Sequence, residues 1–185
     1  MEKIKRILDS GTSDKKIKKL ESISSINNAE IVQKIISMLD DDDIQVRGEA
    51  FSSLLLNKNE ISDILIKNLR STSKNIRGFT ALVLANRNES NAIQDIIKLT
   101  HDQHSMVRAC ALGALGHLKA TAAKDTILNC LLDSDLEVRK SALQAVINIG
   151  CSLSENRIKE ISIQSEPELE RLLSNVKRKS GPKGI

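Results

Sequence analysis

The sequence of 185 residues has almost no aromatic side chains: it contains no Trp, no Tyr and two Phe, Phe51 and Phe79. A core built from this chain must therefore be filled by Ile, Leu, Val and Ala. Hydrophobic residues make up 40% of the chain, which is enough to fill such a core. The small side chains among them let neighbouring helices approach closely.

Cysteines and long apolar runs are also scarce. The three cysteines, Cys110, Cys130 and Cys151, are an odd number without CxxC spacing, which argues against a disulfide framework or a cysteine-rich zinc site. No stretch approaches the roughly 18 consecutive apolar residues of a membrane span, and the first residues lack the apolar run of a secretory signal. We therefore expect a soluble, cytoplasmic protein with no membrane partner.

A Val/Ile-Arg pair recurs along the chain. Its arginines are 30, 31 and 31 residues apart, at Arg47, Arg77, Arg108 and Arg139. Self-similarity at this period is typical of a solenoid, in which each repeat packs against its neighbours. The period indicates an architecture and a general class of work, which is binding, but it does not name the molecule that is bound.

Each repeat predicts two helices. Small or apolar residues follow each arginine at three and seven positions, on the same face of a helix: Ala50 and Leu54, Thr80 and Leu84, Ala111 and Leu115, Ala142 and Val146. A second apolar set precedes each arginine: Ile36 and Leu39, Ile66 and Leu69, Ile96 and Leu99, Leu128 and Leu131. Short polar turns rich in helix-capping residues separate the two sets. We expect an all-α fold, an α-solenoid of about six antiparallel helix pairs.

The pattern Asp-x-x-Val-Arg-x-x-Ala-x-x-Ala-Leu-Gly resembles the HEAT-like repeat, particularly the subtype named after phycocyanobilin lyases. Residues 106–118 and 133–150 carry the best matches, and the resemblance is strong over residues 28–152. Outside that range it weakens, since Lys16, Leu20 and Ile23 keep the register without the arginine. Terminal repeats of a solenoid are usually atypical because their outer face meets water.

The repeat register predicts the domain organisation. It gives four HEAT-like repeats between two cap repeats, followed by a basic tail: 1–27 as the N-terminal basic cap, 28–58, 59–89, 90–120 and 121–152 as repeats, 153–176 as the C-terminal cap, and 177–185 as the tail. The tail contains Gly, Pro and charge but little to bury, so we expect it to be disordered.

The net charge of +4 belongs to the ends of the chain. Residues 1–27 carry seven Lys or Arg against four Asp or Glu, and residues 177–185 carry four against none. Electrostatic binding of nucleic acid through these ends is therefore an alternative function. Its candidate phosphate contacts are Lys15, Lys16, Lys18, Lys19, Lys177, Arg178 and Lys179.

The repeated arginines stand in the first turn of each second helix, where a cation opposes the helix dipole. The resemblance implies that they pair with aspartates in a ladder that ties adjacent repeats together. The predicted ladder residues are Asp43, Arg47, Arg77, Arg108, Asp135 and Arg139. Direct contact between these arginines and a ligand is the alternative.

No catalytic set stands out. His101 and His104 flank Asp102, but His117 lies 13 residues further on, so the three histidines do not form one metal site. There is no Ser/His/Asp set and no Gly-rich phosphate loop. The resemblance to chromophore lyases suggests an enzyme by family name only, and the sequence contains no His-Glu pair of the kind that binds iron in related hydroxylases. We expect no enzyme activity, no cofactor and no metal.

The resemblance implies that the second helices line a concave face. In the central repeats this face carries an apolar strip with polar borders, which suggests a groove for a partner helix or strand. The predicted function is therefore a non-enzymatic scaffold that binds a peptide or protein there, through Phe79, Leu82, Asn86, Cys110, His117, Gln144 and Asn148. The alternative is that Phe79 and Leu82 pack against a neighbouring repeat.

Overall fold

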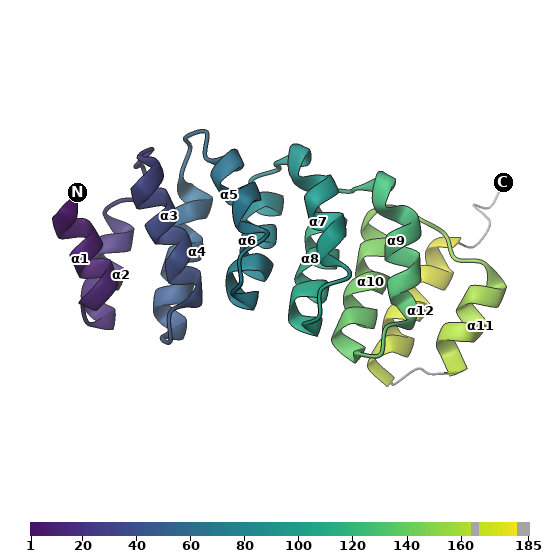
Figure 1. The fold of residues 1–185 in the computed structure, drawn as a ribbon. Helices are drawn as coiled ribbons and strands as arrows, with labels where there is room; N and C mark the ends of the chain where they lie inside the picture. Colours follow the sequence, from purple (N-terminus) through teal and green to yellow (C-terminus); the bar gives the residue numbers. More distant parts are fainter. Residues whose placement is uncertain (164–166, 181–185) are drawn as a thin grey trace. The chain divides into compact units, whose positions relative to one another are not determined.

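The computed structural model describes residues 1–163 and 167–180, and their side chains apart from those of 163 and 175–180. This described part contains twelve α-helices, four short 3-10 helices and no strand (Figure 1). The α-helices are α1 (Glu2–Ser10), α2 (Ser13–Glu21), α3 (Ala29–Ser37), α4 (Ile44–Leu56), α5 (Ser62–Asn68), α6 (Lys74–Asn86), α7 (Ile93–Leu99), α8 (Ser105–His117), α9 (Lys124–Asn129), α10 (Leu136–Asn148), α11 (Glu155–Ile163) and α12 (Pro167–Ser180). The 3-10 helices are η1 (Met38–Asp40), η2 (Ser90–Ala92), η3 (Thr121–Ala123) and η4 (Cys130–Leu132).

The helices follow one another as six pairs, in which a turn separates the two members. The first five pairs fall within residues 1–27, 28–58, 59–89, 90–120 and 121–152, and the sixth, α11 with α12, runs from Glu155 to Ser180. The chain forms two compact units, the first ending at Asp95 and the second beginning at Ile96. The border falls within α7, so the predicted repeat 90–120 is divided between the units.

Unit 1 has two layers of helices. The first helices of its pairs, α1, α3 and α5, contact one another in chain order, and the second helices α2, α4 and α6 do the same (Figure 1). Each pair also packs across the two layers. The core between them is aliphatic, as the composition requires, and includes Leu8, Leu20, Ile35, Leu54 and Leu84, all fully buried.

Unit 2 is organised around α10, which contacts α8, α9 and α12. The contact between α8 and α10 is the most extensive between any two helices of the described chain. Fully buried Val107, Leu112 and Leu115 lie on α8, and fully buried Leu143 and Val146 lie on α10. An ion pair between Lys140 and Glu168, 2.7 Å long, joins α10 to α12.

The second helices end in the way that their sequences favour. Glycine-like backbone stands just after α6, α8 and α10, where Asn88, Lys119 and Gly150 have φ values of 59°, 49° and 71°. After α10 the amide of Cys151 donates to the carbonyl of Val146, 3.1 Å away, which is the hydrogen bond of a Schellman motif. Gly150 adopts this conformation at no steric cost, whereas a side chain such as that of Lys119 strains it.

α12 continues to Ser180, into the first residues of the predicted tail, whose disorder stays a prediction. Lys and Arg are good helix formers, so residues 177–180 extend a helix that Pro167 begins. The Gly-Pro sequence that breaks a helix comes only at residues 181–182. Residues 181–185, the rest of the predicted tail, lie outside the described residues. Within the described part, no helix combines the length and apolarity that a membrane span requires.

Candidate protein-binding groove and the arginine turns

An apolar groove lies on α4 and α6 of unit 1. Its volume is about 410 Å³, and it is lined by Ile44, Arg47, Gly48, Phe51, Phe79 and Leu82. Both phenylalanines of the chain therefore meet in one place. Phe51, Phe79 and Leu82 are half-buried, while Ile44 is 72% exposed. A surface of this kind, with two aromatic rings at its centre and an exposed aliphatic side chain beside them, is suited to binding an apolar side chain.

Phe79 and Leu82, the first two residues predicted for the binding face, both line this groove. Both side chains are half-buried, and their groove includes Ile44 and Phe51 of the preceding repeat. Their assignment to a binding face therefore stays a prediction, and so does the alternative that they pack against a neighbouring repeat. Asn86, on the same helix, is exposed, and its side-chain amide donates to the carbonyl of Leu82 over 2.8 Å.

The other four predicted residues belong to unit 2. His117 on α8 and Gln144 and Asn148 on α10 are exposed, and the amide of Gln144 donates to Asn148 over 2.9 Å. Cys110 is half-buried with its Sγ 3.7 Å from the Sδ of Met106. Burial raises the pKa of the Cys110 thiol to about 11, so the thiol is neutral at physiological pH. That these four residues share one binding site with Phe79 and Leu82 stays a prediction.

Sequence reasoning missed Phe51 and Ile44 as part of the groove. Phe51 stands four residues after Arg47, a position that the repeat register assigns to the core face. In the structure the ring is half-buried and reaches the groove. Its rarity was the signal that could have found it, since one of two aromatic residues in an aliphatic chain is a candidate for a binding role.

The repeated arginines close the turns of their own repeats. In every case Nη1 donates to the carbonyl oxygens of the residues six and five positions earlier. The distances are 2.7 and 3.1 Å for Arg47, 2.8 and 3.0 Å for Arg77, 3.0 and 3.5 Å for Arg108, and 2.8 and 3.1 Å for Arg139. These hydrogen bonds explain why a cation is placed in the first turn of a helix despite the helix dipole.

Arg108, and Lys16 at the corresponding position of the first repeat, also reach the next repeat. Nε and Nη2 of Arg108 donate to the carboxylate of Asp133 over 2.9 and 2.7 Å. Lys16, which takes the arginine's place in the first repeat, donates to Asp41 over 2.6 Å. The carboxylates that meet these two cations are Asp133 and Asp41, which lie two residues before the predicted ladder residues Asp135 and Asp43.

Asp43 and Asp135 cap helices in the structure, and their assignment as partners of the arginines stays a prediction. Asp43 accepts from the amide of Gln45, and Asp135 accepts from the amides of Glu137 and Val138. A hydrogen bond from a serine hydroxyl of the preceding repeat lowers the pKa of each carboxyl, and the capped amides add to the effect. These serines are Ser13 for Asp43 and Ser105 for Asp135.

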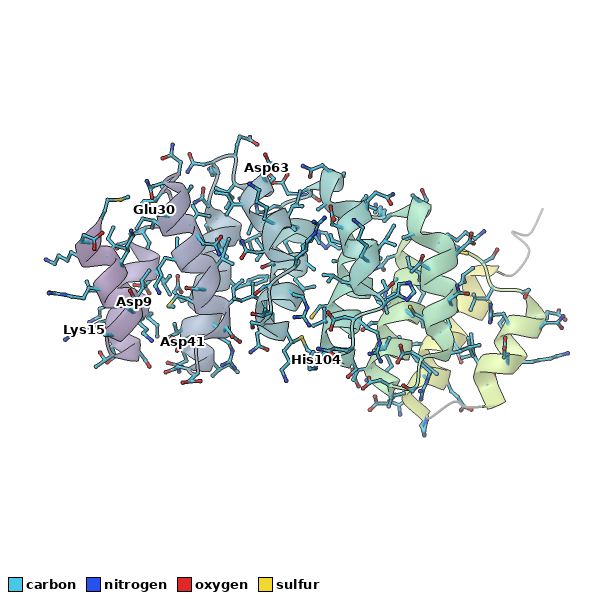
Figure 2. The ribbon with its side chains drawn as sticks, in the orientation of Figure 1. Asp9, Lys15, Glu30, Asp41, Asp63 and His104 are labelled. Carbon is cyan, nitrogen blue, oxygen red and sulfur yellow. The ribbon has the colours of Figure 1, made fainter. Side chains whose placement is uncertain are left out.

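The basic residues predicted to contact phosphate are not equivalent. Lys15 and Lys18 on α2 are exposed, and Lys19 is half-buried. Figure 2 labels Lys15. The side chain of Lys16 is 16% exposed and its ammonium is paired with Asp41, so it is not free to bind a phosphate. The side chains of Lys177, Arg178 and Lys179 lie outside the described ones.

A second hollow, of about 580 Å³, lies between α1 and α3 of unit 1. Ion pairs cross it: Lys5 donates to Glu30 over 2.6 Å, and Lys34 pairs with Asp9. Figure 2 shows Asp9 on α1 and Glu30 on α3. These ion pairs join the first two repeats. Because the charges are already paired with one another, the hollow has little charge left to bind a ligand.

Among the described residues, no group of three or more His, Cys, Asp or Glu side chains converges in a way that could hold a metal ion. Asp102, the carboxylate between the two neighbouring histidines, accepts from the backbone amide of His104 over 2.9 Å. It therefore shapes the turn before α8.

Comparisons with known proteins agree with this architecture. Residues 62–147 match the family model of HEAT repeats. No curated protein matches the sequence. Three similar solved structures are designed or engineered: a computationally designed armadillo repeat protein for modular peptide recognition (16% identity, TM-score 0.57), a designed armadillo repeat protein in complex with the peptide (KR)4 (18%, 0.56) and an engineered protein (20%, 0.55). Each match covers 96% of this chain, and 98%, 98% and 96% of the respective similar chain.

These likenesses concern the fold. They confirm the all-α repeat solenoid that the period of 30 to 31 residues predicted. The finer assignment, to the subtype named after phycocyanobilin lyases, stays a prediction.

Proposed function

We propose that the chain, of which residues 62–147 match the family model of HEAT repeats, is a non-enzymatic scaffold that binds a peptide or a peptide segment of a protein. The binding site is the groove on α4 and α6. The observation that carries this proposal is the meeting of Phe51, Phe79 and Leu82 in an open apolar groove of about 410 Å³. The groove lies on the second helices, the layer that the sequence assigns to a concave binding face.

Two further observations support the proposal. Buried aromatic anchors dominate the energy of many protein interfaces, and this chain places both of its aromatic side chains at one surface site. Two of the similar structures are designed armadillo repeat proteins, one described as made for modular peptide recognition and one solved with a bound peptide. Their overall fold is therefore compatible with peptide binding.

The test is a selection of peptides from a random phage-displayed library on the immobilised full-length protein. We expect the wild type to enrich peptides with apolar residues. The double variant Phe79→Ser, Leu82→Ser should lose this enrichment because its groove no longer offers an apolar floor. Ile44→Ser, which removes a largely exposed side chain at the edge of the same groove, should weaken binding without a risk to folding.

The matched control is Leu56→Ser. Leu56 is 66% exposed on α4 but does not line the groove, so this variant should select the same peptides as the wild type. Equal enrichment by the wild type and by the Phe79→Ser, Leu82→Ser variant would refute the groove as the site.

The alternative function makes a different prediction. Nucleic acid bound through the exposed Lys15 and Lys18 should dissociate steeply as salt is raised and should not depend on Phe79 or Leu82. Binding of a labelled DNA duplex with that salt dependence would favour the alternative. The cytoplasmic location stays a prediction.

A further inference from the structure

The arginine turns of unit 1 differ in one position that decides where a guanidinium can bind. The first residue of each turn faces the cation of the preceding repeat: Asp41 takes this place for Lys16, and Asp133 takes it for Arg108 in unit 2. For Arg47 the corresponding residue is Ser71, which has no carboxylate. The three turns share one hydrogen bond, since the side chains of Ser71, Asp41 and Asp133 each accept from the amide two residues later.

Arg47 therefore keeps N–H donors, at Nε and Nη2, that the equivalent Arg108 uses to bind a carboxylate. Its Nη1 donates to the carbonyls of Asp41 and Asp42. The Nε and Nη2 edge, which in Arg108 holds a carboxylate, makes no ion pair with any side chain that the structure describes. Asp43 is close enough for Arg47 to lower the pKa of its carboxyl slightly, but that carboxylate is already occupied by the Ser13 hydroxyl and the Gln45 amide.

The unpaired edge belongs to a residue of the groove. Arg47 is half-buried and is the only charged residue among the six that line the apolar pocket. A guanidinium presents two parallel N–H donors that match a carboxylate, and such a pair strengthens where neighbouring apolar side chains exclude water. Arg47 thus adds a selective polar contact to a surface that is otherwise apolar.

We propose that Arg47 receives a carboxylate of the bound peptide, so that the groove selects peptides in which an acidic residue accompanies apolar ones. This inference rests on the proposed function and names the chemistry of its partner. The peptide carboxylate takes the place that Asp133 holds against Arg108. A peptide whose charges are basic should be excluded, because it would bring a like charge to Arg47.

The decisive variant is Ser71→Asp. It supplies the carboxylate that Asp41 and Asp133 provide in the equivalent turns. The hydrogen bond to the amide two residues later is made by Ser in one turn and by Asp in the others. The new carboxylate should pair with Arg47, raise stability at neutral pH and block acidic peptides. Ser71→Asn is the matched control, since it fits the same turn without the charge and should leave peptide binding unchanged.

The experiment has two steps on the full-length protein. First, peptides are selected from the random library on the wild type and on Ser71→Asp. We expect Asp or Glu at a constant spacing from the apolar residues in the wild-type pool and no such enrichment with Ser71→Asp. Second, the affinity of the most enriched peptide is compared with that of its copy in which the acidic residue is changed to the corresponding amide.

Removing the peptide's charge should weaken binding to the wild type about tenfold or more, the effect of one charge-assisted hydrogen-bonded pair. The same change should have little effect on binding to Ser71→Asp. Arg47→Gln, if urea unfolding shows it folded, should likewise make the acidic peptide and its amide copy bind equally. An octapeptide of alternating Lys and Leu should bind the wild type less well than one of alternating Glu and Leu.

The results separate this inference from the proposed function. Apolar peptides that depend on Phe79 and Leu82 but show no acidic preference would refute the role of Arg47 and leave the groove standing. Acidic peptides that bind Ser71→Asp as tightly as the wild type would also refute it. If no peptide is enriched by the wild type, the proposed function and the inference both fail.

Discussion

Two pairs of second helices, α4 with α6 in unit 1 and α8 with α10 in unit 2, have the same register but present different surfaces. Between α8 and α10 the backbones approach so closely that a Cβ on Gly116 would lie 2.9 Å from the Cα of Ala145. On α4, a Cβ on Gly48 would meet nothing within 4 Å. One glycine allows two helices to touch, and the other lines an open groove.

The side chains explain the difference. The α8 sequence from Ala109 to Gly116 is rich in Ala and Gly, which permits the extensive contact with α10. α4 and α6 each carry a phenylalanine, and both rings remain half-buried at the groove. The repeat pattern thus sets the course of the backbone. A few side chains then decide whether a pair of second helices packs tightly or leaves a surface for binding.

The largest expected effect is at the close contact. Gly116→Ala should lower the free energy of unfolding by about 1 to 3 kcal/mol, because the added methyl meets backbone that cannot move aside cheaply. This loss outweighs the gain of up to about 1 kcal/mol that alanine has over glycine in a helix. Urea unfolding followed by circular dichroism measures it. An unchanged or higher stability would show that α8 and α10 are further apart than described.

The second largest effect on stability is expected at the contacts between a repeat cation and the turn of the next repeat. This contact is an ion pair between Arg108 and Asp133, whereas Ser71, at the equivalent position after Arg47, has no carboxylate. Burial opposes ionisation of Asp133, but hydrogen bonds from Arg108 and the Asp135 amide outweigh it, so the pKa of this carboxyl is lowered. A lowered pKa stabilises the fold above the ordinary value of about 4, and the contribution disappears as pH falls through the folded-state value.

Asp133→Asn should therefore cost about 1 to 2 kcal/mol at pH 7, the range of a largely buried charge-assisted pair. The asparagine still fits the turn, so the loss reports the charge. Unfolding in urea at pH 7 and at pH 3 distinguishes the cause: the difference between wild type and variant should shrink in acid. An equal difference at both pH values would assign the loss to packing.

Most of the fold was predictable because it depends on local patterns that repeat. Apolar residues on one helix face and capping residues such as Asp43 and Asp135 locate the helix pairs. The arginines mark the register, and the six pairs follow from it. The sequence does not locate the end of α12, because charged residues such as those at 177–179 are common in disordered tails and also favour a helix.

The site was only partly predictable because it depends on how neighbouring repeats meet. Phe79 and Leu82 could be placed on the binding face by counting from Arg77, but Phe51 has a core position in the register and reaches the groove in three dimensions. Likewise, spacing alone does not say whether Asp133 or Asp135 binds an arginine. The choice follows from the cap, which occupies Asp135 with helix amides.

The smallest effect on stability is expected at Gly48, the glycine in the open groove. Replacing it with alanine should stabilise the fold, the opposite of the effect of Gly116→Ala. Gly48→Ala should raise the free energy of unfolding by about 0.5 to 1 kcal/mol, since alanine favours a helix and its methyl has open space. The measurement is the same urea unfolding as for Gly116→Ala, so the two substitutions test the comparison directly. A loss of stability at Gly48 would mean that α4 and α6 are as closely packed as α8 and α10.

The peptide selected on the wild type gives this variant a second readout. If the groove is the binding site, the methyl of Gly48→Ala narrows it beside Arg47 and Phe51 and should weaken peptide binding while the fold becomes more stable. A binding surface that sacrifices stability for function should show this pattern, with the free energy of unfolding rising while the affinity for the peptide falls. Stability and affinity that rise together would mean that the peptide binds elsewhere.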